Sequence, residues 1–200
     1  GFVYTGTAMV GVRIGWESLL CCYLLACTIY ASDYAGSGNE PRRESAHLAR
    51  HVVWLYPLAL IALLVIERSW SALIWVVILL GLGLAYAGWF KGLSRRLPWF
   101  KDLFVSLLWS MLVPLAVACA RADFVPVLLW AMLYLFVGTF VNVAICDVKD
   151  IPEDEHEGIL TPAVMLGVRR LSTLLHLVNA VSALGLVAGI STGIFRPQSV

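Results

Sequence analysis

Residues 147–154 of this chain read Asp147-Val148-Lys149-Asp150-Ile151-Pro152-Glu153-Asp154. They follow residues 124–146, a run without charged side chains that is long enough to cross a bilayer. If the segment is helical, its three aspartates share one face, because they are spaced by three and four residues. Carboxylates on one face repel one another, and a divalent cation would relieve that repulsion. Mg²⁺ is suited to this role, since it is held by a few carboxylates together with the phosphates of a substrate. The alternative is a solvated acidic loop that merely ends a helix.

The composition indicates an integral membrane protein. The chain has 200 residues, of which 60% are hydrophobic and 14% are charged, whereas roughly a quarter of the residues in soluble domains are charged. One small core cannot bury this much apolar surface. The net charge of +1 and the absence of a basic stripe exclude nucleic acid as a partner. The five cysteines all lie in apolar runs and are predicted to be small hydrophobic residues, not zinc ligands or disulfides.

Apolar runs predict the membrane helices. A short run at residues 2–12 is interpreted as the end of a first helix. Six further spans are predicted at residues 14–31, 51–66, 69–90, 103–120, 124–146 and 171–195. Residues 32–43 are predicted to be a loop, and Glu67-Arg68 and residues 121–123 are predicted to be tight turns. Because neither an internal repeat nor a long linker is evident, we expect one all-α, multi-pass membrane domain over residues 1–200.

The basic residues predict the orientation of the chain. Ten of the fourteen lie in the loops of one side: Arg42, Arg43, Arg50, Lys91, Arg95, Arg96, Lys101, Lys149, Arg169 and Arg170. The positive-inside rule places these loops on the cytoplasmic side of the cell inner membrane or its equivalent. The long polar loops and the aspartate segment are on that side, so we expect the chemistry there as well.

These groups together suggest a diphosphate site. Asp33 is predicted to end one helix and residues 147–154 to end another at the same membrane surface, with the basic loop at residues 91–102 between them in the sequence. Carboxylates, Mg²⁺ and Arg or Lys side chains form a clamp for diphosphate and stabilise the charge on a diphosphate leaving group. Long apolar helices suit a lipid tail. The residues therefore suggest ionisation of a prenyl diphosphate inside the membrane.

Two segments resemble a known family. Residues 147–154, followed by Gly158-Ile159-Leu160-Thr161-Pro162-Ala163-Val164-Met165-Leu166-Gly167, resemble the second aspartate-rich motif of the UbiA superfamily of intramembrane prenyltransferases. Lys101-Asp102-Leu103-Phe104, with Trp109 further on, is similar to the segment that opens the fifth helix of that family. The resemblance covers essentially the whole chain and implies a helical bundle. About seven of the family's nine helices are expected here, the last ones lying beyond the chain.

The resemblance also implies an activity and its residues. The activity is Mg²⁺-dependent transfer of a prenyl group from a prenyl diphosphate to a lipophilic acceptor, often an aromatic ring, among the membrane lipids. The implied catalytic residues are Asp33, Asp147, Asp150, Asp154 and Lys101. The implied metal ligands are Asp33, Asp147, Asp150 and Asp154, with Glu40 as a further oxygen donor. The implied diphosphate-binding residues are Lys101, Arg95, Arg96 and Lys149.

The first motif of the family, approximately NDxxDxxxD, is altered in this chain. Ser32 stands at the Asn position, Gly36 at the middle Asp and Glu40 at the last Asp. This departure leaves open a non-catalytic UbiA-like protein that binds or carries a lipid. A phosphotransferase for CDP-activated alcohols is disfavoured, since its motif needs Asp-Gly and Ala-Arg, whereas Ile151 and Pro152 follow Asp150. A transporter is disfavoured because the charges gather at one face. Acceptor, prenyl chain length and oligomeric state stay open.

Overall fold

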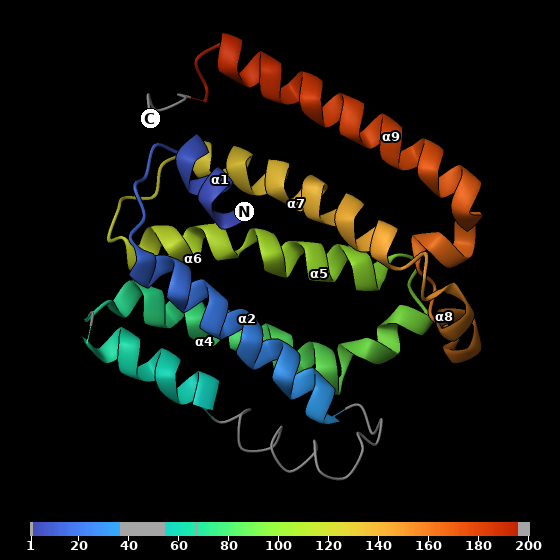
Figure 1. The fold of residues 1–200 in the computed structure, drawn as a ribbon, viewed down its shortest axis with the longest axis horizontal. Coiled ribbons are helices and arrows are strands. Elements are labelled where there is room, and N and C mark those ends of the chain that lie inside the picture. Colours follow the sequence, from blue (N-terminus) through green and yellow to red (C-terminus); the bar gives the residue numbers. More distant parts are fainter. Residues whose placement is uncertain (1, 37–54, 67, 196–200) are drawn as a thin grey trace. The chain divides into compact units, whose positions relative to one another are not determined.

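A computed structural model describes residues 2–36, 55–66 and 68–195, and every regular element in these ranges is a helix (Figure 1). The helices in chain order are α1 (Phe2–Met9), α2 (Trp16–Gly36), the helix Leu55–Ile66, α4 (Trp70–Gly88), the 3₁₀ helix η1 (Phe90–Arg95), α5 (Phe100–Ser110), α6 (Leu112–Cys119), α7 (Val127–Cys146), α8 (Ile151–Glu157) and α9 (Pro162–Ser191). The predicted all-α class is confirmed.

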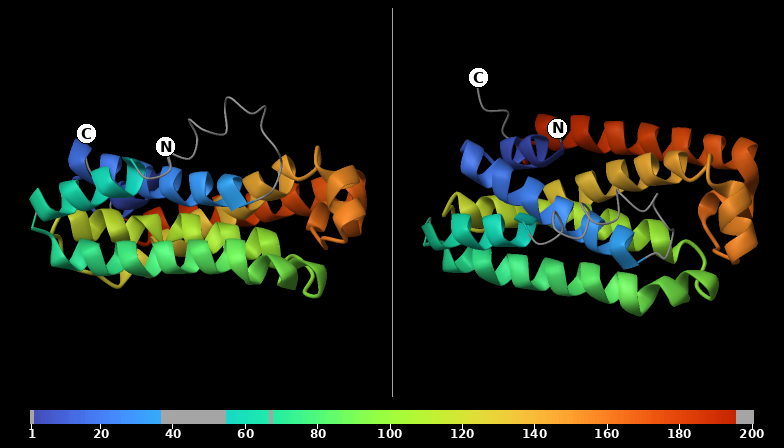
Figure 2. Two further views of the ribbon diagram at one scale, coloured as in Figure 1. Left: turned by 90° about the horizontal axis from the view of Figure 1, so that it is seen from below. Right: turned by 60° about the horizontal axis from the view of Figure 1, so that its bottom comes forward.

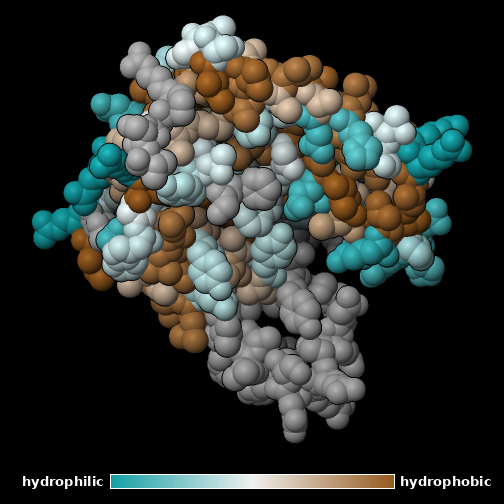
Figure 3. Space-filling view, turned by 45° about the horizontal axis from the view of Figure 1, so that its top comes forward, coloured by the Kyte–Doolittle hydropathy of each residue, from teal (hydrophilic) through white to brown (hydrophobic). Residues whose placement is uncertain are grey.

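Three helical segments in the described ranges are long and apolar enough to cross a membrane: Phe100–Cys119, Val127–Cys146 and Pro162–Ser191. Hydrophobic side chains are exposed on the surface (Figure 3). On α9, for example, Leu177, Val181 and Leu184 are more than half exposed. A helix that leaves so much apolar surface uncovered is stable where lipid surrounds it.

The predicted tight turns are confirmed at Arg68 and Arg121, and Glu67 lies outside the described residues. Arg68 and Arg121 both adopt positive φ, at 49° and 54°. The Arg68 N–H donates to the Val65 carbonyl at 3.2 Å, and the Arg121 N–H donates to the Ala118 carbonyl at 3.1 Å. Each bond closes a tight turn directly after the end of a helix, so the chain reverses its direction within a few residues.

The interval between the predicted spans 124–146 and 171–195 is partly helical, so the predicted start of the last span was wrong. α8 forms within it, and α9 begins at Pro162, well before the predicted start at Leu171. The reason is local. The Val164 N–H donates to the Thr161 hydroxyl, which caps α9, and proline is favoured in a first helical turn. These capping signals start α9 before Arg169 and Arg170, the charges that the predicted span had excluded.

The chain forms two compact units. Unit 1 comprises residues 1–11, 89–113 and 125–200. In unit 1, α7 lies between α5 and α9 and contacts both, and α1 also packs on α7 (Figures 1 and 2). A Cβ at Gly6 of α1 would lie 2.5 Å from Leu135 and 2.7 Å from Val113, so glycine permits this close approach.

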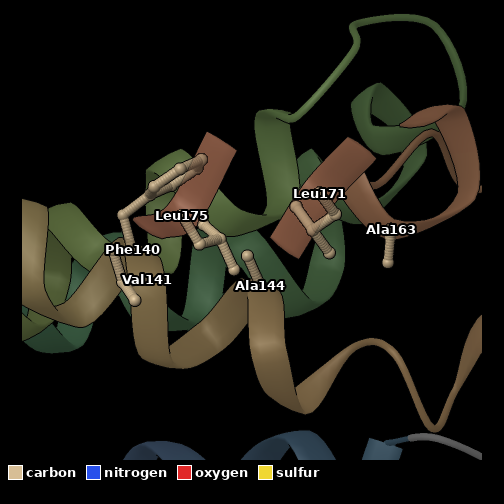
Figure 4. Packing of buried hydrophobic residues seen from close by; sticks show 6 residues of the cluster. All are labelled: Phe140, Val141, Ala144, Ala163, Leu171 and Leu175. Atoms are coloured by element: carbon tan, nitrogen blue, oxygen red, sulfur yellow. The ribbon is translucent and has the colours of Figure 1, made fainter. Parts of the chain in front are cut away.

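α7 and α9 run in opposite directions and share a buried core. Phe140, Val141 and Ala144 of α7 face Leu171 and Leu175 of α9 (Figure 4). In Figure 1, the start of α5, the end of α7 and α8 meet at one end of unit 1. Packing of α7 against α5 and α9 thus brings the aspartate segment to the first turn of α5.

Unit 2 comprises residues 12–88 and 114–124, and within it α2 packs on α4. A Cβ at Gly83 of α4 would lie 2.9 Å from the Ile29 side chain of α2, so the two helices approach closely. The Ser69 hydroxyl donates to the Ala118 carbonyl at 3.1 Å, and the rings of Trp75 and Phe124 stack at 6.1 Å. The single domain expected over residues 1–200 stays a prediction.

Candidate functional site

Lys101 joins two of the three aspartates of the acidic segment. It lies in the first turn of α5, and its Nζ is 3.1 Å from Oδ1 of Asp147. The same Nζ donates to both Asp154 oxygens, each at 3.3 Å. The Lys101 side chain is 24% exposed, whereas the two carboxylate side chains are 6% exposed. An ammonium group thus links two carboxylates that are almost removed from solvent.

The aspartate segment is not one continuous helix, so the predicted shared helical face was wrong. α7 ends at Cys146, Asp147 caps its C-terminus, and residues 147–150 form a turn. The Asp150 N–H donates to the Asp147 carbonyl at 3.0 Å, and α8 starts immediately afterwards with Pro152 in its first turn. Because proline suits a helix start, the sequence restarts a helix here instead of extending α7. Asp147 and Asp154 therefore approach Lys101 from two different helices.

Asp154 is held in an environment that disfavours its charged form. It is 4% exposed on the inner face of α8. Burial raises the pKa of its carboxyl above the usual value; Lys101 lowers it, and the neighbouring charges of Asp147 and Asp150 raise it. The net pKa shift is upward, so the attraction of Lys101 does not fully compensate this carboxylate.

Backbone hydrogen bonds fix the position of Lys101 relative to the acidic segment. The Leu160 N–H donates to the Ser94 carbonyl at 2.9 Å, and the Trp99 N–H donates to the Leu160 carbonyl at 2.7 Å. Trp99 precedes α5 with a left-handed φ of 62°, and its ring lies 6.3 Å from that of Phe140. Backbone hydrogen bonds therefore join the segment before α5 to the segment after α8, and the ring of Trp99 also packs near Phe140 of α7.

Asp102 is a site residue to which the sequence interpretation assigned no role. It is fully buried, at 0% exposure. Among the described residues, neither of its oxygens has a hydrogen-bond partner, and neither does Oδ2 of Asp147. Asp147 is close enough to interact with Asp102 electrostatically. The sequence did contain a signal for Asp102: it is an acidic residue beside Lys101 at the start of a membrane span. Burying such a residue costs free energy, so its presence there indicates a functional role. Lys101, Asp102, Asp147 and Asp154 are called the Lys101 cluster below.

The other predicted residues are not brought into these contacts. Arg95 and Arg96 are exposed at the end of η1, and Lys149 is exposed in the turn after α7. Asp150 is half-buried and acts on the cluster through its charge. The backbone of Asp33 lies in α2 of unit 2, but its side chain is outside the described part of the structure. Glu40 lies outside the described residues altogether.

The Lys101 cluster fits a divalent cation by its unpartnered oxygens. Within the described ranges, no three His, Cys, Asp or Glu side chains are already grouped as a metal site. Mg²⁺ does not need such a cage, since one or two carboxylates and the phosphates of a substrate complete its coordination. Both oxygens of Asp102 and Oδ2 of Asp147 are buried without hydrogen-bond donors among the described residues. Hard oxygen donors of this kind are the ligands that Mg²⁺ prefers.

Comparison with known proteins identifies one related family. The model of the UbiA prenyltransferase family matches residues 41–197. This range contains η1, α5 and the whole acidic segment, and it does not include Asp33. No curated protein and no solved structure matches the chain.

Proposed function

Because this chain is an integral membrane protein that belongs to the UbiA prenyltransferase family, we propose that it transfers a prenyl group from a prenyl diphosphate to a lipophilic acceptor, such as an aromatic ring, in a Mg²⁺-dependent reaction. The observation that carries this proposal is the position of Lys101 between Asp147 and Asp154 at the end of two membrane helices. A cation among carboxylates at that place suits a bound diphosphate, while the adjoining apolar helices suit its tail.

Lys101 is proposed to bind the diphosphate. Its Nζ is shared among three oxygens at 3.1–3.3 Å, whereas strong charge-assisted bonds are about 2.7–2.9 Å long. None of these contacts is at its optimal length, and the side chain is partly exposed. The ammonium can therefore exchange a carboxylate oxygen for a diphosphate oxygen at low cost. Once bound, it donates to the leaving group as negative charge accumulates there.

Asp147, Asp150 and Asp154 are proposed to hold Mg²⁺. When bound, Mg²⁺ neutralises the diphosphate and lowers the energy of its departure. The three carboxylates would hold the ion, and with it the diphosphate, at the membrane surface. Arg95, Arg96 and Lys149 are proposed as further diphosphate contacts because they are exposed cations near both ends of the site in the sequence. Asp33 and Glu40 are proposed as additional oxygen donors on the strength of the family resemblance.

The apolar helices are proposed to protect the reacting carbon. An allylic cation formed by loss of diphosphate is captured by water unless water is excluded. α5 and α7 leave Lys101 at their end and continue as apolar segments, Phe100–Cys119 with α6 and Val127–Cys146. A prenyl chain anchored by its diphosphate at Lys101 would extend along such surfaces, away from the aqueous phase.

A non-catalytic lipid-binding relative is the second candidate. Two observations favour it: Gly36 stands where the first motif of the family has an aspartate, and the Lys101 ammonium already neutralises part of the carboxylate charge. Such a protein would bind the prenyl diphosphate without breaking its carbon–oxygen bond.

The test is Mg²⁺-dependent binding and turnover of radiolabelled geranylgeranyl diphosphate by the purified protein with a panel of aromatic acceptors. We expect diphosphate release, reduced about a hundredfold or more in Lys101→Ala, Asp147→Ala and Asp150→Ala. Glu155→Ala is the matched control, because this α8 side chain is exposed. Binding without release would favour the lipid-binding candidate. Absence of metal-dependent binding would contradict both candidates.

A further inference from the structure

The buried acidic side chains of the described residues all belong to one cluster. They are Asp102, Asp147 and Asp154, at 0%, 4% and 4% exposure. They come from α5, from the end of α7 and from α8. Within the described part of the chain, Lys101 is the cation that contacts Asp147 and Asp154, and no ion pair joins it to Asp102. Three carboxyl groups therefore share one ammonium in a place that water barely reaches.

Asp102 is the least compensated member of this cluster. Lys101 contacts Oδ1 of Asp147 and both oxygens of Asp154. Neither Asp102 oxygen has a hydrogen-bond partner among the described residues. Burying a carboxylate without a donor or a counterion is costly, and such a residue normally marks a functional requirement.

Helix capping does not explain Asp102. An acidic side chain in a first turn stabilises a helix when it accepts a bond from a free backbone N–H or faces its dipole in solvent. The Asp102 carboxylate does neither, since it is buried and without a donor. The Ser106 hydroxyl bonds the backbone carbonyl of Asp102 at 2.6 Å and leaves its carboxylate unchanged.

The unpartnered oxygens lie on two neighbouring residues. Both Asp102 oxygens and Oδ2 of Asp147 lack donors, and the two carboxylates are close enough to interact. Two adjacent buried carboxyl groups whose facing oxygens have no donor from another side chain can be bridged by a hard cation, which takes the place of a shared proton.

We propose that Asp102, together with Asp147, is a ligand of the divalent cation that this site binds with diphosphate. The inference rests on the proposed function in that the same cation serves the diphosphate. It extends the site from the aspartate segment to α5, and it leaves Lys101 available for diphosphate oxygens. Asp102 is thereby a metal ligand that neither the acidic motif nor the basic loop had indicated.

The first test measures cation binding without turnover. The full chain is purified in detergent micelles, and free Mn²⁺ is quantified by electron paramagnetic resonance in the presence of inorganic pyrophosphate. We expect Asp102→Asn and Asp147→Asn each to weaken Mn²⁺ binding about tenfold or more. Glu155→Gln, an exposed change on α8, is expected to bind Mn²⁺ like the wild type.

Thermal unfolding distinguishes a metal ligand from a structural residue. Without metal, Asp102→Asn is expected to melt at the same or a higher temperature than the wild type, because the amide has nearly the same size and needs no counterion. With Mn²⁺ and pyrophosphate, the wild type is expected to gain more than the variant. A lower melting temperature of both Asp102→Asn and the smaller Asp102→Ser without metal would assign a structural role and overturn the inference.

The outcomes separate this inference from the proposed function. Mn²⁺ binding that is lost in Asp147→Asn but unchanged in Asp102→Asn would overturn the role of Asp102 and leave the proposed function standing. A wild-type chain that binds no Mn²⁺ with pyrophosphate would overturn both.

Discussion

At the scale of single residues, Lys101 is the counterion of Asp147 and Asp154. Its ammonium is the positive charge seen against these buried carboxylates in the described structure. Removing one partner of a buried ion pair typically costs about 3 kcal/mol or more, and partial exposure of Lys101 reduces that cost. The cluster is therefore expected to depend on a positive charge at this position, whether from a side chain or from a bound ion.

Lys101→Gln is expected to lower the melting temperature of the metal-free protein, by the equivalent of about 1–3 kcal/mol. Mg²⁺ is expected to restore part of the loss, since it supplies the missing charge. The measurement is thermal unfolding in detergent with EDTA and then with Mg²⁺. Arg95→Gln, which removes an exposed cation, should change stability by less than about 0.5 kcal/mol. Equal effects of the two changes would contradict the counterion role.

The environment of Asp154 predicts that the free energy of unfolding depends on pH. Its pKa in the folded protein is raised above the ordinary value of 3.8, chiefly by burial. The folded state therefore keeps this proton more strongly than the unfolded state. The stability that Asp154 contributes is complete below the unfolded pKa and is lost as the pH rises through the folded pKa.

Asp154→Asn, which cannot titrate at this position, provides the comparison. In EDTA, the melting temperature of the wild type minus that of Asp154→Asn is expected to decrease as the pH is raised from about 4 to 7. Unfolding curves at several pH values measure this difference. A difference that stays constant or increases with pH would show that burial of Asp154 does not govern its ionisation.

At the scale of elements, α9 has a break that the local sequence requires. Gly167 adopts φ 68° and ψ 163° inside the helix, a conformation that is essentially restricted to glycine. The short part of α9 before Gly167 stays beside α8, while the part after it packs on α7 through Leu171 and Leu175. The break thus links the end that carries the site to the membrane-spanning part of the helix.

Gly167→Ala and Gly185→Ala are expected to act in opposite directions. A Cβ at either position meets no atom within 4 Å, so backbone conformation alone distinguishes them. Gly167→Ala should destabilise by about 1–3 kcal/mol. Gly185→Ala, at an ordinary helical position of α9, should stabilise by about 0.5–1 kcal/mol. Thermal unfolding of both variants checks this, and equal shifts would argue against the break at Gly167.

At the scale of the whole molecule, the sidedness of the loops is the open structural prediction. The distribution of basic residues predicts a cytoplasmic position for the Lys101 cluster. The turn at residues 121–123 is predicted to face the opposite side. Glu155 of α8 and Asp123 of that turn are both exposed, so they are suitable probe positions.

Single cysteines at these two positions, in a background without the native cysteines, test the orientation. In intact cells, a membrane-impermeant maleimide should label Asp123→Cys and leave Glu155→Cys unlabelled. After the membranes are opened, both should react. Labelling of Glu155→Cys in intact cells would place the acidic segment on the outer side and would contradict the orientation.

The amino-acid sequence by itself determined the all-α class, the membrane location, the family and the tight turns at Arg68 and Arg121. These features depend on local properties: the length of apolar runs, the position of charges and the residues that end a helix. The Gly158–Gly167 segment was recognised as a motif, but the start of α9 at Pro162 within it was missed, because the last span was predicted to begin only after the charges of Arg169 and Arg170.

The tertiary structure decided which charges meet. Lys101 lies 46 positions before Asp147 in the chain, and only the packing of α5 against α7 brings its ammonium to 3.1 Å from that carboxylate. Because residues 147–150 form a turn, Asp154 lies in a separate helix and contacts the same ammonium from there. It does not share one continuous helical face with Asp147, as the spacing had predicted. Burial of Asp102 likewise follows from packing. Contacts between distant residues depend on how helices assemble, and no local pattern encodes that.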